Sequence, residues 1–375
     1  MKFTIAASVS LAAVASAAPS VDTAPRTYGS RVSSDLEPEF KPKRAAGVQY
    51  FGVNIAGFDF GCGTDGTCVT SQVDPPLQSL GGADGAGQMS HFTKDLGMNI
   101  FRLPVGWQYL VDNQLGGTLN SGNAANYDQL VQACLSTGAS CIIDIHNYAR
   151  WNGAIIGQGG PTNAQFTSLW TQIATKYAST KNVIFGIMNE PHDLNSITTW
   201  AETVQAAVTA IREAETQANG IQHMLLLPGS SYSSAQTLPT EAGPALLGVV
   251  NPDNSTTNLI FDVHKYSDSD NSGTHANCTT DNISNAFQPL ATWLRTNKRQ
   301  ALNTEMGGGN TASCEDYVCA QIQFVNMNAD VYLGYVGWAA GSFNAQTYVL
   351  SEVPVKNGNT WTDQPLVADC FKDTY

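Results

Sequence analysis

Short apolar runs recur along this chain at broadly regular spacing. Most are rich in β-forming residues and almost uninterrupted by polar ones, which is typical of strands buried on both faces of a sheet. Eight of them are expected to be strands, at residues 50–55, 99–105, 141–146, 183–189, 224–228, 259–264, 300–305 and 332–338.

Longer segments with helical periodicity lie between these runs, and Gly, Asn and Pro mark the joins. They include residues 128–135, 163–176, 196–215 and 283–296. Strand and helix alternating eight times predict an α/β fold, a single-domain (β/α)₈ TIM barrel. An open doubly wound sheet gives the same alternation, but Gly52 and Gly57 lack the spacing of its dinucleotide-binding fingerprint. The Gly-rich segment 80–87 is expected to be a loop.

The first 44 residues do not fit the barrel pattern. Residues 1–18 have one charge, Lys2, then an apolar stretch and small residues, which predict a secretory signal peptide rather than an uncleaved anchor. Residues 19–44 are polar and end in Lys43-Arg44, which predicts a propeptide or disordered leader with a dibasic processing site. A leader that stays attached is the alternative. The catalytic domain is then expected at 45–375, in a secreted, extracellular protein without a membrane-spanning segment.

The charge balance narrows the range of partners. The whole chain has 18 basic and 31 acidic residues; residues 1–44 hold six and four of these, which leaves a net charge of −15 for the rest. Such a surface repels phosphate backbones and anionic lipid. We therefore expect no nucleic-acid or membrane partner, and a neutral substrate suits this surface.

Cysteine usage agrees with secretion. An even count in a secreted chain predicts disulfides, although eight cysteines allow 105 pairings. The eight are Cys62, Cys68, Cys134, Cys141, Cys278, Cys314, Cys319 and Cys370. Cys-x-x-Cys and His-Glu-x-x-His motifs are missing from the sequence, so we expect no metal and no cofactor. Three N-glycosylation sequons start at Asn254, Asn277 and Asn282.

Polar residues gather at the ends of the predicted strands, where barrel enzymes carry their catalytic groups. Among them are two glutamates, Glu190 and Glu305, each at the end of an apolar run. Cleavage of an acetal needs one carboxyl group that holds a proton and a second that is ionised. The pair therefore predicts a glycosidase. The other polar or aromatic residues at strand ends are Arg102, His146, Asn189, His264 and Trp338.

Six segments taken in order resemble the fungal endo-β-1,4-glucanases of glycoside hydrolase family 5, from about residue 47 to the C-terminus. They are FRLP at 101–104, DIHNY at 144–148, NEP at 189–191, DVHKY at 262–266, TEMGGGN at 304–310 and GWAAGSF at 337–343. The resemblance implies retaining hydrolysis of internal β-1,4-glucosidic bonds in cellulose and related β-glucans. A mannanase or β-1,3-glucanase of the same family is the alternative, and a non-catalytic glucan-binding protein is a third hypothesis.

The resemblance also implies residue roles. Glu190 would be the general acid/base and Glu305 the nucleophile, about 5–5.5 Å apart. Arg102 would keep Glu305 ionised, Tyr266 would donate to it, and Asn189 would bond the sugar 2-hydroxyl. Further contacts with sugar are expected from His146, His264, Trp338, Tyr148, Trp151 and Trp107.

Other implications concern covalent and quaternary structure. The resemblance implies disulfides 62–68, 134–141, 278–314 and 319–370. A monomer is expected, with a β-glucan polysaccharide as its partner. The segment from Asp268 to Gly273 begins like a calcium loop, but Thr279 stands where that loop needs glutamate, so we expect a polar loop at the rim of the cleft.

Overall fold

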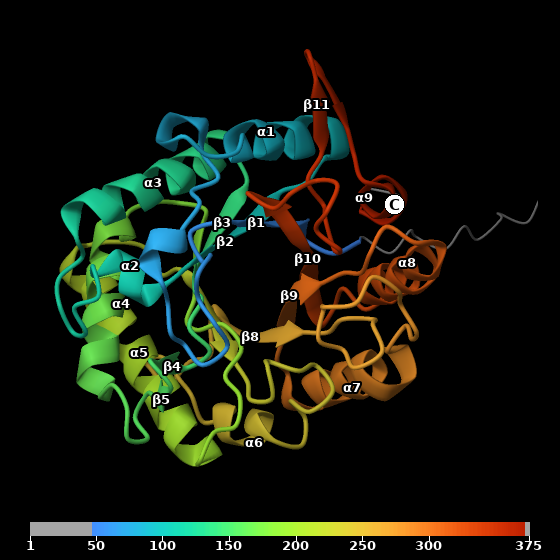
Figure 1. The fold of residues 1–375 in the computed structure, drawn as a ribbon. Helices are drawn as coiled ribbons and strands as arrows, with labels where there is room; N and C mark the ends of the chain where they lie inside the picture. The colour runs from blue at the N-terminus through green and yellow to red at the C-terminus, as the bar shows by residue number, and fades with distance from the viewer. Residues whose placement is uncertain (1–46, 372–375) are drawn as a thin grey trace, which may run out of the picture. The chain divides into compact units, whose positions relative to one another are not determined.

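The computed structural model describes residues 47–371. Within them, eight parallel strands close into a barrel in the order β1-β10-β9-β8-β7-β6-β3-β2, and helices surround it (Figure 1). The strands are β1 (Tyr50–Ala56), β2 (Ile100–Val105), β3 (Ser140–Ile145), β6 (Val183–Gly186), β7 (Met224–Pro228), β8 (Leu259–His264), β9 (Ala301–Met306) and β10 (Tyr332–Gly341). Each overlaps one of the eight predicted runs, so the predicted (β/α)₈ barrel is confirmed.

The helices follow the strands in alternation and include the four segments with helical periodicity. They are α1 (Gly85–Leu96), α2 (Trp107–Leu110), α3 (Ser121–Ser136), α4 (Asn163–Tyr177), α5 (Ile197–Gln217), α6 (Ala242–Leu246), α7 (Gln288–Asn297), α8 (Ala312–Met327) and α9 (Pro365–Cys370). A π-helical turn, Ile283–Phe287, continues directly into α7. Among the described residues, no helix is long and apolar enough to cross a membrane.

Two short β-hairpins lie in loops outside the barrel sheet. β4 (Arg150–Trp151) pairs with β5 (Ala154–Ile155) after β3, and β11 (Val355–Asn357) pairs with β12 (Thr360–Thr362) after β10. The predicted signal peptide (1–18) and leader (19–44) lie outside the described residues.

The prediction that residues 80–87 form a loop is partly wrong. The first turn of α1 begins at Gly85, and the Asp84 side chain caps it by accepting the backbone N–H of Gly87. An Asp N-cap offsets the poor helix propensity of the two glycines in that turn. Glycine is needed at position 85, because a Cβ there would meet the carbonyl oxygen of Pro76 at 2.5 Å.

The barrel interior has its own apolar core, separate from the larger core between strands and helices. It is a ring of buried side chains from seven strands: Ile100, Ile142, Ile184, Leu226, Ile260, Leu302, Leu333 and Val336. Because inward side chains on a strand recur every two residues, the next inward positions lie closer to the carboxyl ends of the strands. The ring is therefore the floor on which the polar residues above it rest.

Four disulfides join the eight cysteines, as the family resemblance implied: Cys62–Cys68, Cys134–Cys141, Cys278–Cys314 and Cys319–Cys370. The first closes the loop after β1 and the third ties the loop after β8 to α8. Both of these loops border the carboxyl face of the barrel, so the covalent links stabilise the segments that surround the polar residues described next.

Candidate active site

Charged side chains form a layer directly above the apolar ring. On β3, Ile142 of the ring is followed at the same parity by Asp144 and then by His146. β8 repeats the pattern with Asp262 and His264. A strand that is inward-facing at one position is inward-facing two residues later. Along β3 and β8, the inward-facing side chains are therefore first apolar, then charged, and finally directed to the cleft.

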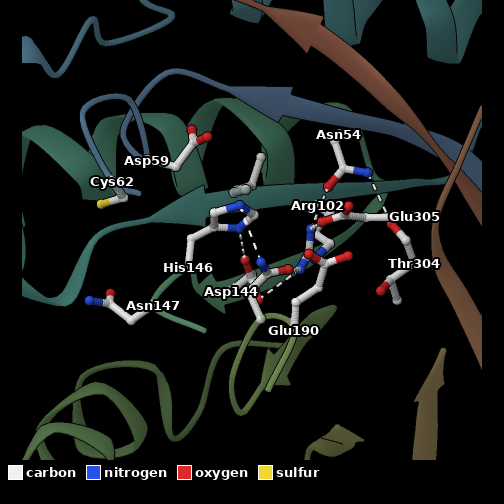
Figure 2. A network of polar contacts seen from close by, with 12 residues as sticks. Asn54, Asp59, Cys62, Arg102, Asp144, His146, Asn147, Glu190, Thr304 and Glu305 are labelled. Atoms are coloured by element: carbon white, nitrogen blue, oxygen red, sulfur yellow. Dashed lines mark hydrogen bonds and ion pairs between the residues drawn. The ribbon is translucent and has the colours of Figure 1, made fainter. Parts of the chain in front are cut away.

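Arg102 on β2 is the central cation of this layer and is fully buried. Its Nη1 donates to Glu305 Oε1 over 2.5 Å and to Asn54 Oδ1 over 3.0 Å. Its Nη2 donates to Asn189 Oδ1 over 2.7 Å and lies 3.0 Å from Asp144 Oδ1. Figure 2 shows this network, with the side chains coming from neighbouring strands. A buried guanidinium between two carboxylates balances their charge and fixes their positions.

Glu305 on β9 is the more strongly stabilised of the two glutamates in its ionised form. Burial opposes its ionisation, but the positive charges of His264 and Arg102 outweigh burial and lower the pKa of Glu305 to about 2. Tyr266 adds to this effect by donating its hydroxyl to Glu305 Oε2 over 2.8 Å. The expected contacts of Arg102 and Tyr266 with Glu305 are therefore present.

Glu190 lies just beyond the end of β6 and has the opposite tendency. Its pKa is raised, first by burial and then by the negative charge of Glu305, and a hydrogen bond from His264 offsets part of this rise. His264 Nδ1 lies 2.8 Å from Glu190 Oε1. The backbone φ of Glu190 is 43°, a left-handed conformation that costs about 1 kcal/mol or more for such a residue. Strain of this kind concentrates at functional positions.

The two glutamates are close neighbours. One carboxylate oxygen of Glu190, one of Glu305 and one ring nitrogen of His264 all lie within 4.8 Å of one another. A retaining pair stands about 5–5.5 Å apart, whereas an inverting pair needs about 6.5–9.5 Å to admit water. The close approach of these oxygens fits a retaining pair better than an inverting one.

His146 and Trp338 form one wall beside the glutamates. Their rings stack with centroids 5.4 Å apart and an interplanar angle of 12°. Asp144 Oδ2 lies 2.8 Å from His146 Nδ1 and fixes the ring orientation. Burial alone would lower the pKa of His146, but the hydrogen bond and charge of Asp144 raise it. The indole N–H of Trp338 donates to the hydroxyl of Tyr348 over 2.9 Å, which holds the indole in place.

A cleft of about 1000 Å³ opens above these residues. Both glutamates line it, together with residues of the loops after β1, β7, β8 and β10. Sugar rings have apolar faces that stack on aromatic side chains. The aromatic residues of the cleft lining are Phe60, Tyr148, Tyr232, Tyr266, Trp338, Phe343 and Tyr348. Of the sugar contacts expected from the sequence, Tyr148, His146, His264 and Trp338 therefore face the cleft.

The expected sugar contacts of Trp107 and Trp151 are wrong. Trp107 is fully buried and Trp151 is 8% exposed, and neither lines the cleft. Their rings pack edge to face with centroids 5.1 Å apart, and Trp107 also packs on Phe166 of α4. A ring covered on both faces by protein has no face left for a sugar, so these indoles are core residues.

Asn189 and His192, on either side of Glu190 in the sequence, are also buried. Asn189 is fully buried, accepts from Arg102 and lies 3.3 Å from His146 Nε2, so its sugar bond stays a prediction. His192 stacks on Tyr232 with centroids 4.3 Å apart, and its ring nitrogens face Asp193 and the carbonyl of Thr64. His192 therefore supports the cleft wall from behind.

Several residues of the site were not found from the sequence. Asp59 is 7% exposed, accepts the backbone N–H of Gly57 and lines the cleft. Tyr232, Phe343 and Tyr348 supply aromatic surface from loops, where no periodic pattern marks them. Asp262 and Thr304 belong to the charged layer. Their positions one inward step past the apolar ring are a signal that side-chain parity could have supplied.

The loop that resembles a calcium site borders the cleft, as expected. Its residues from Asp270 to Thr274 line the cleft wall. The carboxylate of Asp268 accepts the backbone N–H groups of Gly273, Thr274 and His275. These bonds use the Asp268 oxygens inside the loop. That the protein binds no metal stays a prediction.

Comparison with known proteins gives a family and close relatives. The family model described as cellulase (glycosyl hydrolase family 5) matches residues 59–344, which include Glu190 and Glu305. Endoglucanase EG-II of Hypocrea jecorina is 65% identical over 332 residues, covering 87% of this chain and 78% of that protein. The manganese dependent endoglucanase Eg5A of Phanerodontia chrysosporium is 51% identical over 324 residues, covering 86% and 78%.

Similarity extends to solved structures. The crystal structure of Cel5A (EG2) from Hypocrea jecorina (Trichoderma reesei) superposes with a TM-score of 0.84 at 64% identity. The aligned residues cover 88% of this chain and 100% of that one. The likeness therefore extends over the whole barrel and not over isolated motifs.

Proposed function

The chain belongs to glycosyl hydrolase family 5, the cellulase family, and on this basis we propose that it is an endo-β-1,4-glucanase that cleaves cellulose and related β-glucans with retention. One observation carries the proposal. Two carboxyl groups with opposite pKa shifts lie within 4.8 Å of each other in an aromatic-lined cleft. A glycosidase that forms a covalent intermediate needs this arrangement.

In the first step, ionised Glu305 attacks the anomeric carbon of the bound sugar. The bond to the leaving oxygen breaks, and Glu190 transfers its proton to that oxygen. An ester between Glu305 and the sugar is left, and Glu190 is ionised. In the second step, a water molecule gives a proton to Glu190 and its oxygen attacks the anomeric carbon. Glu305 leaves as a carboxylate, and both groups return to their starting protonation states.

The electrostatics support this exchange of roles. The charge of Glu305 is one cause of the raised pKa of Glu190. That charge disappears when Glu305 becomes an ester, so the pKa of Glu190 should fall after the first step. His264, next to both groups, favours the ionised form of Glu190 at this stage. Glu190 is therefore suited to give a proton first and to accept one afterwards.

Cleavage inside a polymer fits the aromatic lining. Phe60 and Phe343 form an aromatic pair on the loops after β1 and β10, with centroids 4.8 Å apart. Tyr232 is 43% exposed on the loop after β7 and faces the same cleft. Aromatic surface beyond Trp338 offers stacking positions for further glucose units. A cleft with several stacking positions can hold glucose units on both sides of the bond to be cut, which suits cleavage within the chain.

We also propose that the mature enzyme acts outside the cell, as a monomer, with β-glucan rather than nucleic acid or membrane as its partner. Four disulfides support an oxidising compartment. The signal-like residues 1–18 and the acidic composition agree with it.

The test is hydrolysis of soluble carboxymethylcellulose, with viscosity and new reducing ends followed together. We expect a fast fall in viscosity with few new ends, which is the sign of internal cleavage. Glu305→Gln should lower kcat by at least about 10⁴-fold while cello-oligosaccharide binding is kept. Glu213→Gln on the exposed side of α5 is the matched control and should behave as the native enzyme.

Two outcomes contradict the proposal in different ways. Turnover of mannan or laminarin in place of cellulose would keep the two-carboxyl mechanism and change the substrate. Normal turnover by Glu305→Gln would remove the assigned nucleophile.

A further inference from the structure

A chain of hydrogen bonds leads away from Glu190 into the barrel. His264 Nδ1 lies 2.8 Å from Glu190 Oε1, and His264 Nε2 lies 2.9 Å from the hydroxyl oxygen of Thr304. The Thr304 hydroxyl in turn donates to Asp262 Oδ1. His264 is 3% exposed, Asp262 is 1% exposed and Thr304 is fully buried. Water therefore has little access to the bonds beyond the ring of His264.

The chain has a direction because a hydroxyl has one hydrogen. Thr304 gives that hydrogen to Asp262 Oδ1, so its oxygen can only accept at the other end. The group that faces it is His264 Nε2, which must therefore hold a proton. Nδ1 is then the one ring atom that can share a proton with Glu190.

The direction of the chain depends on Asp262 being ionised, and the positive charges of His264 and Arg102 favour that form. Burial raises the pKa of Asp262 to about 6, against the charges of His264 and Arg102. Its Oδ2 has no hydrogen-bond partner among the described residues, whereas Oδ1 faces Thr304. Both oxygens of the ionised carboxylate can only accept, so Thr304 donates to Oδ1 while Asp262 is ionised.

The surroundings keep the imidazole of His264 positively charged. Burial alone would lower its pKa, but Glu305, Glu190 and Asp262 raise it to about 9. The positive charge of His264 is in turn the first cause that lowers the pKa of Glu305 against burial. Other charged or titratable groups also face these residues from the packed strands and loops: Arg102, Asp144, His146, Tyr148, Tyr232, Tyr266 and Tyr348.

We propose that Asp262 and Thr304 are positioning residues for acid catalysis, which hold the Nε2 proton of His264 so that its charged ring presents Nδ1 to Glu190. This inference rests on the proposed function and deepens it, because it assigns the control of both catalytic carboxyl groups to two residues that touch no substrate. The side chains of Asp262 and Thr304 are connected to Glu190 through the ring of His264.

An irregularity in β9 makes the chain of hydrogen bonds possible. Between β8 and β9 the register runs from Val263 opposite Asn303 to His264 opposite Glu305, so Thr304 is an extra residue in β9. Such a bulge re-aims neighbouring side chains. Because of this bulge, two consecutive residues belong to the same site. The Thr304 hydroxyl faces the ring of His264, and the Glu305 side chain lines the cleft.

The first test is the dependence of kcat/KM on pH for Thr304→Val, which removes the hydroxyl and keeps the shape. Without an acceptor, the buried Nε2–H is disfavoured and His264 becomes neutral. Loss of this charge raises the pKa of Glu305 and of Glu190, so both limbs of the profile should move to higher pH by about one unit or more. Thr304→Ser, which keeps the hydroxyl, should restore the native profile.

A control separates this effect from a general loss of stability. Thr203 on α5 is also fully buried, and its hydroxyl bonds Asn163 and the carbonyl of Thr199, outside the active site. Thr203→Val should lower the melting temperature without moving either limb. Limbs of Thr304→Val that coincide with the native ones would overturn the proposal, even with a lower kcat.

The second test needs no substrate. Long-range ¹H–¹⁵N spectra of the protein labelled at its histidine ring nitrogens, with His264 identified by its loss in His264→Gln, report which nitrogen holds a proton. We expect Nε2 of His264 to stay protonated and Nδ1 to titrate, with the charged ring lost at lower pH in Thr304→Val. A native Nε2 without its proton would overturn the proposal, whether or not Thr304→Val folds. The expected ring signals in a native protein that cleaves no glucan would instead contradict only the proposed function.

Discussion

The side-chain amide of Asn282 donates to the backbone carbonyl oxygen of Tyr266 over 2.7 Å. Asn282 is fully buried, and its φ of 52° lies in the left-handed region that asparagine tolerates better than most residues. Tyr266 in turn donates to Glu305, the proposed nucleophile. One of the three glycosylation sequons therefore begins at a residue that supports the active site.

An N-glycan is joined to the side-chain nitrogen of asparagine, which Asn282 already uses inside the fold. Asn254 and Asn277 are exposed. We expect glycans on Asn254 and Asn277 and none on Asn282 in the chain secreted from a fungal host. Mass spectrometry of tryptic glycopeptides before and after enzymatic deglycosylation would measure this. A glycan on Asn282 of the active, folded enzyme would contradict the observed burial.

Removing the hydroxyl of Tyr266 should weaken the nucleophile. Tyr266→Phe deletes the hydrogen bond to Glu305 Oε2, one of the causes that lower the pKa of Glu305. A hydrogen bond to a charged group is worth about 1.5–3 kcal/mol, so kcat/KM should fall by about 10- to 150-fold. The acid limb of the pH profile should move to higher pH, because Glu305 then protonates more easily. An unchanged acid limb would mean that the bond carries no charge effect.

Arg102 should matter for stability as much as for activity. Arg102→Met leaves the buried carboxylates of Asp144 and Glu305 without their shared cation. We expect the free energy of unfolding in guanidinium chloride at neutral pH to fall by about 3–5 kcal/mol. Arg295→Gln, which breaks a solvent-exposed pair with Asp330, should cost at most about 1 kcal/mol and is the control. Equal losses in the two variants would contradict a central role for Arg102.

Glu352 should make the protein less stable as pH rises. Its side chain is fully buried against Gly337, where a Cβ would lie 2.3 Å from Oε1, and neither oxygen has a hydrogen-bond partner among the described residues. Burial holds the pKa of Glu352 well above its ordinary value of 4.5.

The sign of this effect follows from proton binding. Above pH 4.5 the unfolded chain loses this proton while the folded chain keeps it, so stability falls by about 1.4 kcal/mol per pH unit up to the folded pKa. Glu352→Gln cannot titrate and should lack this decline. Melting temperatures from pH 4 to 8 for the native protein, Glu352→Gln and the exposed control Glu213→Gln would show it. Parallel curves for all three would mean that Glu352 is ionised in the fold.

Much of the fold was predictable because apolar strands and amphipathic helices recur in a regular pattern along the chain. Each barrel strand is largely buried on both faces, so an unbroken apolar run such as residues 224–228 identifies it without knowledge of its neighbours. The start of α1 was missed because a glycine-rich turn has little helix propensity. Its cap on Asp84 and its close contact with Pro76 become visible only when distant segments meet.

Part of the site was predictable for a similar reason. The carboxyl ends of parallel strands meet at one face, so Glu190, His264 and Glu305 had to come together once the barrel was recognised. The aromatic residues were harder, because a tryptophan near the carboxyl end of a strand can stack on sugar or pack in the core with no difference in its local sequence. Trp338 faces the cleft, whereas Trp107 and Trp151 are covered by protein.

The sequence by itself thus determined the order of strands and helices, the two carboxyl groups and their place at the strand ends, because these depend on periodicity and chain direction. The tertiary structure decided the charge states and the direction of the hydrogen bonds. The extra residue at Thr304, the buried pair of Arg102 with Glu305 and the burial of Glu352 each depend on atoms far apart in the chain. Burial and neighbouring charge act through space, and only the closed barrel brings those atoms within range.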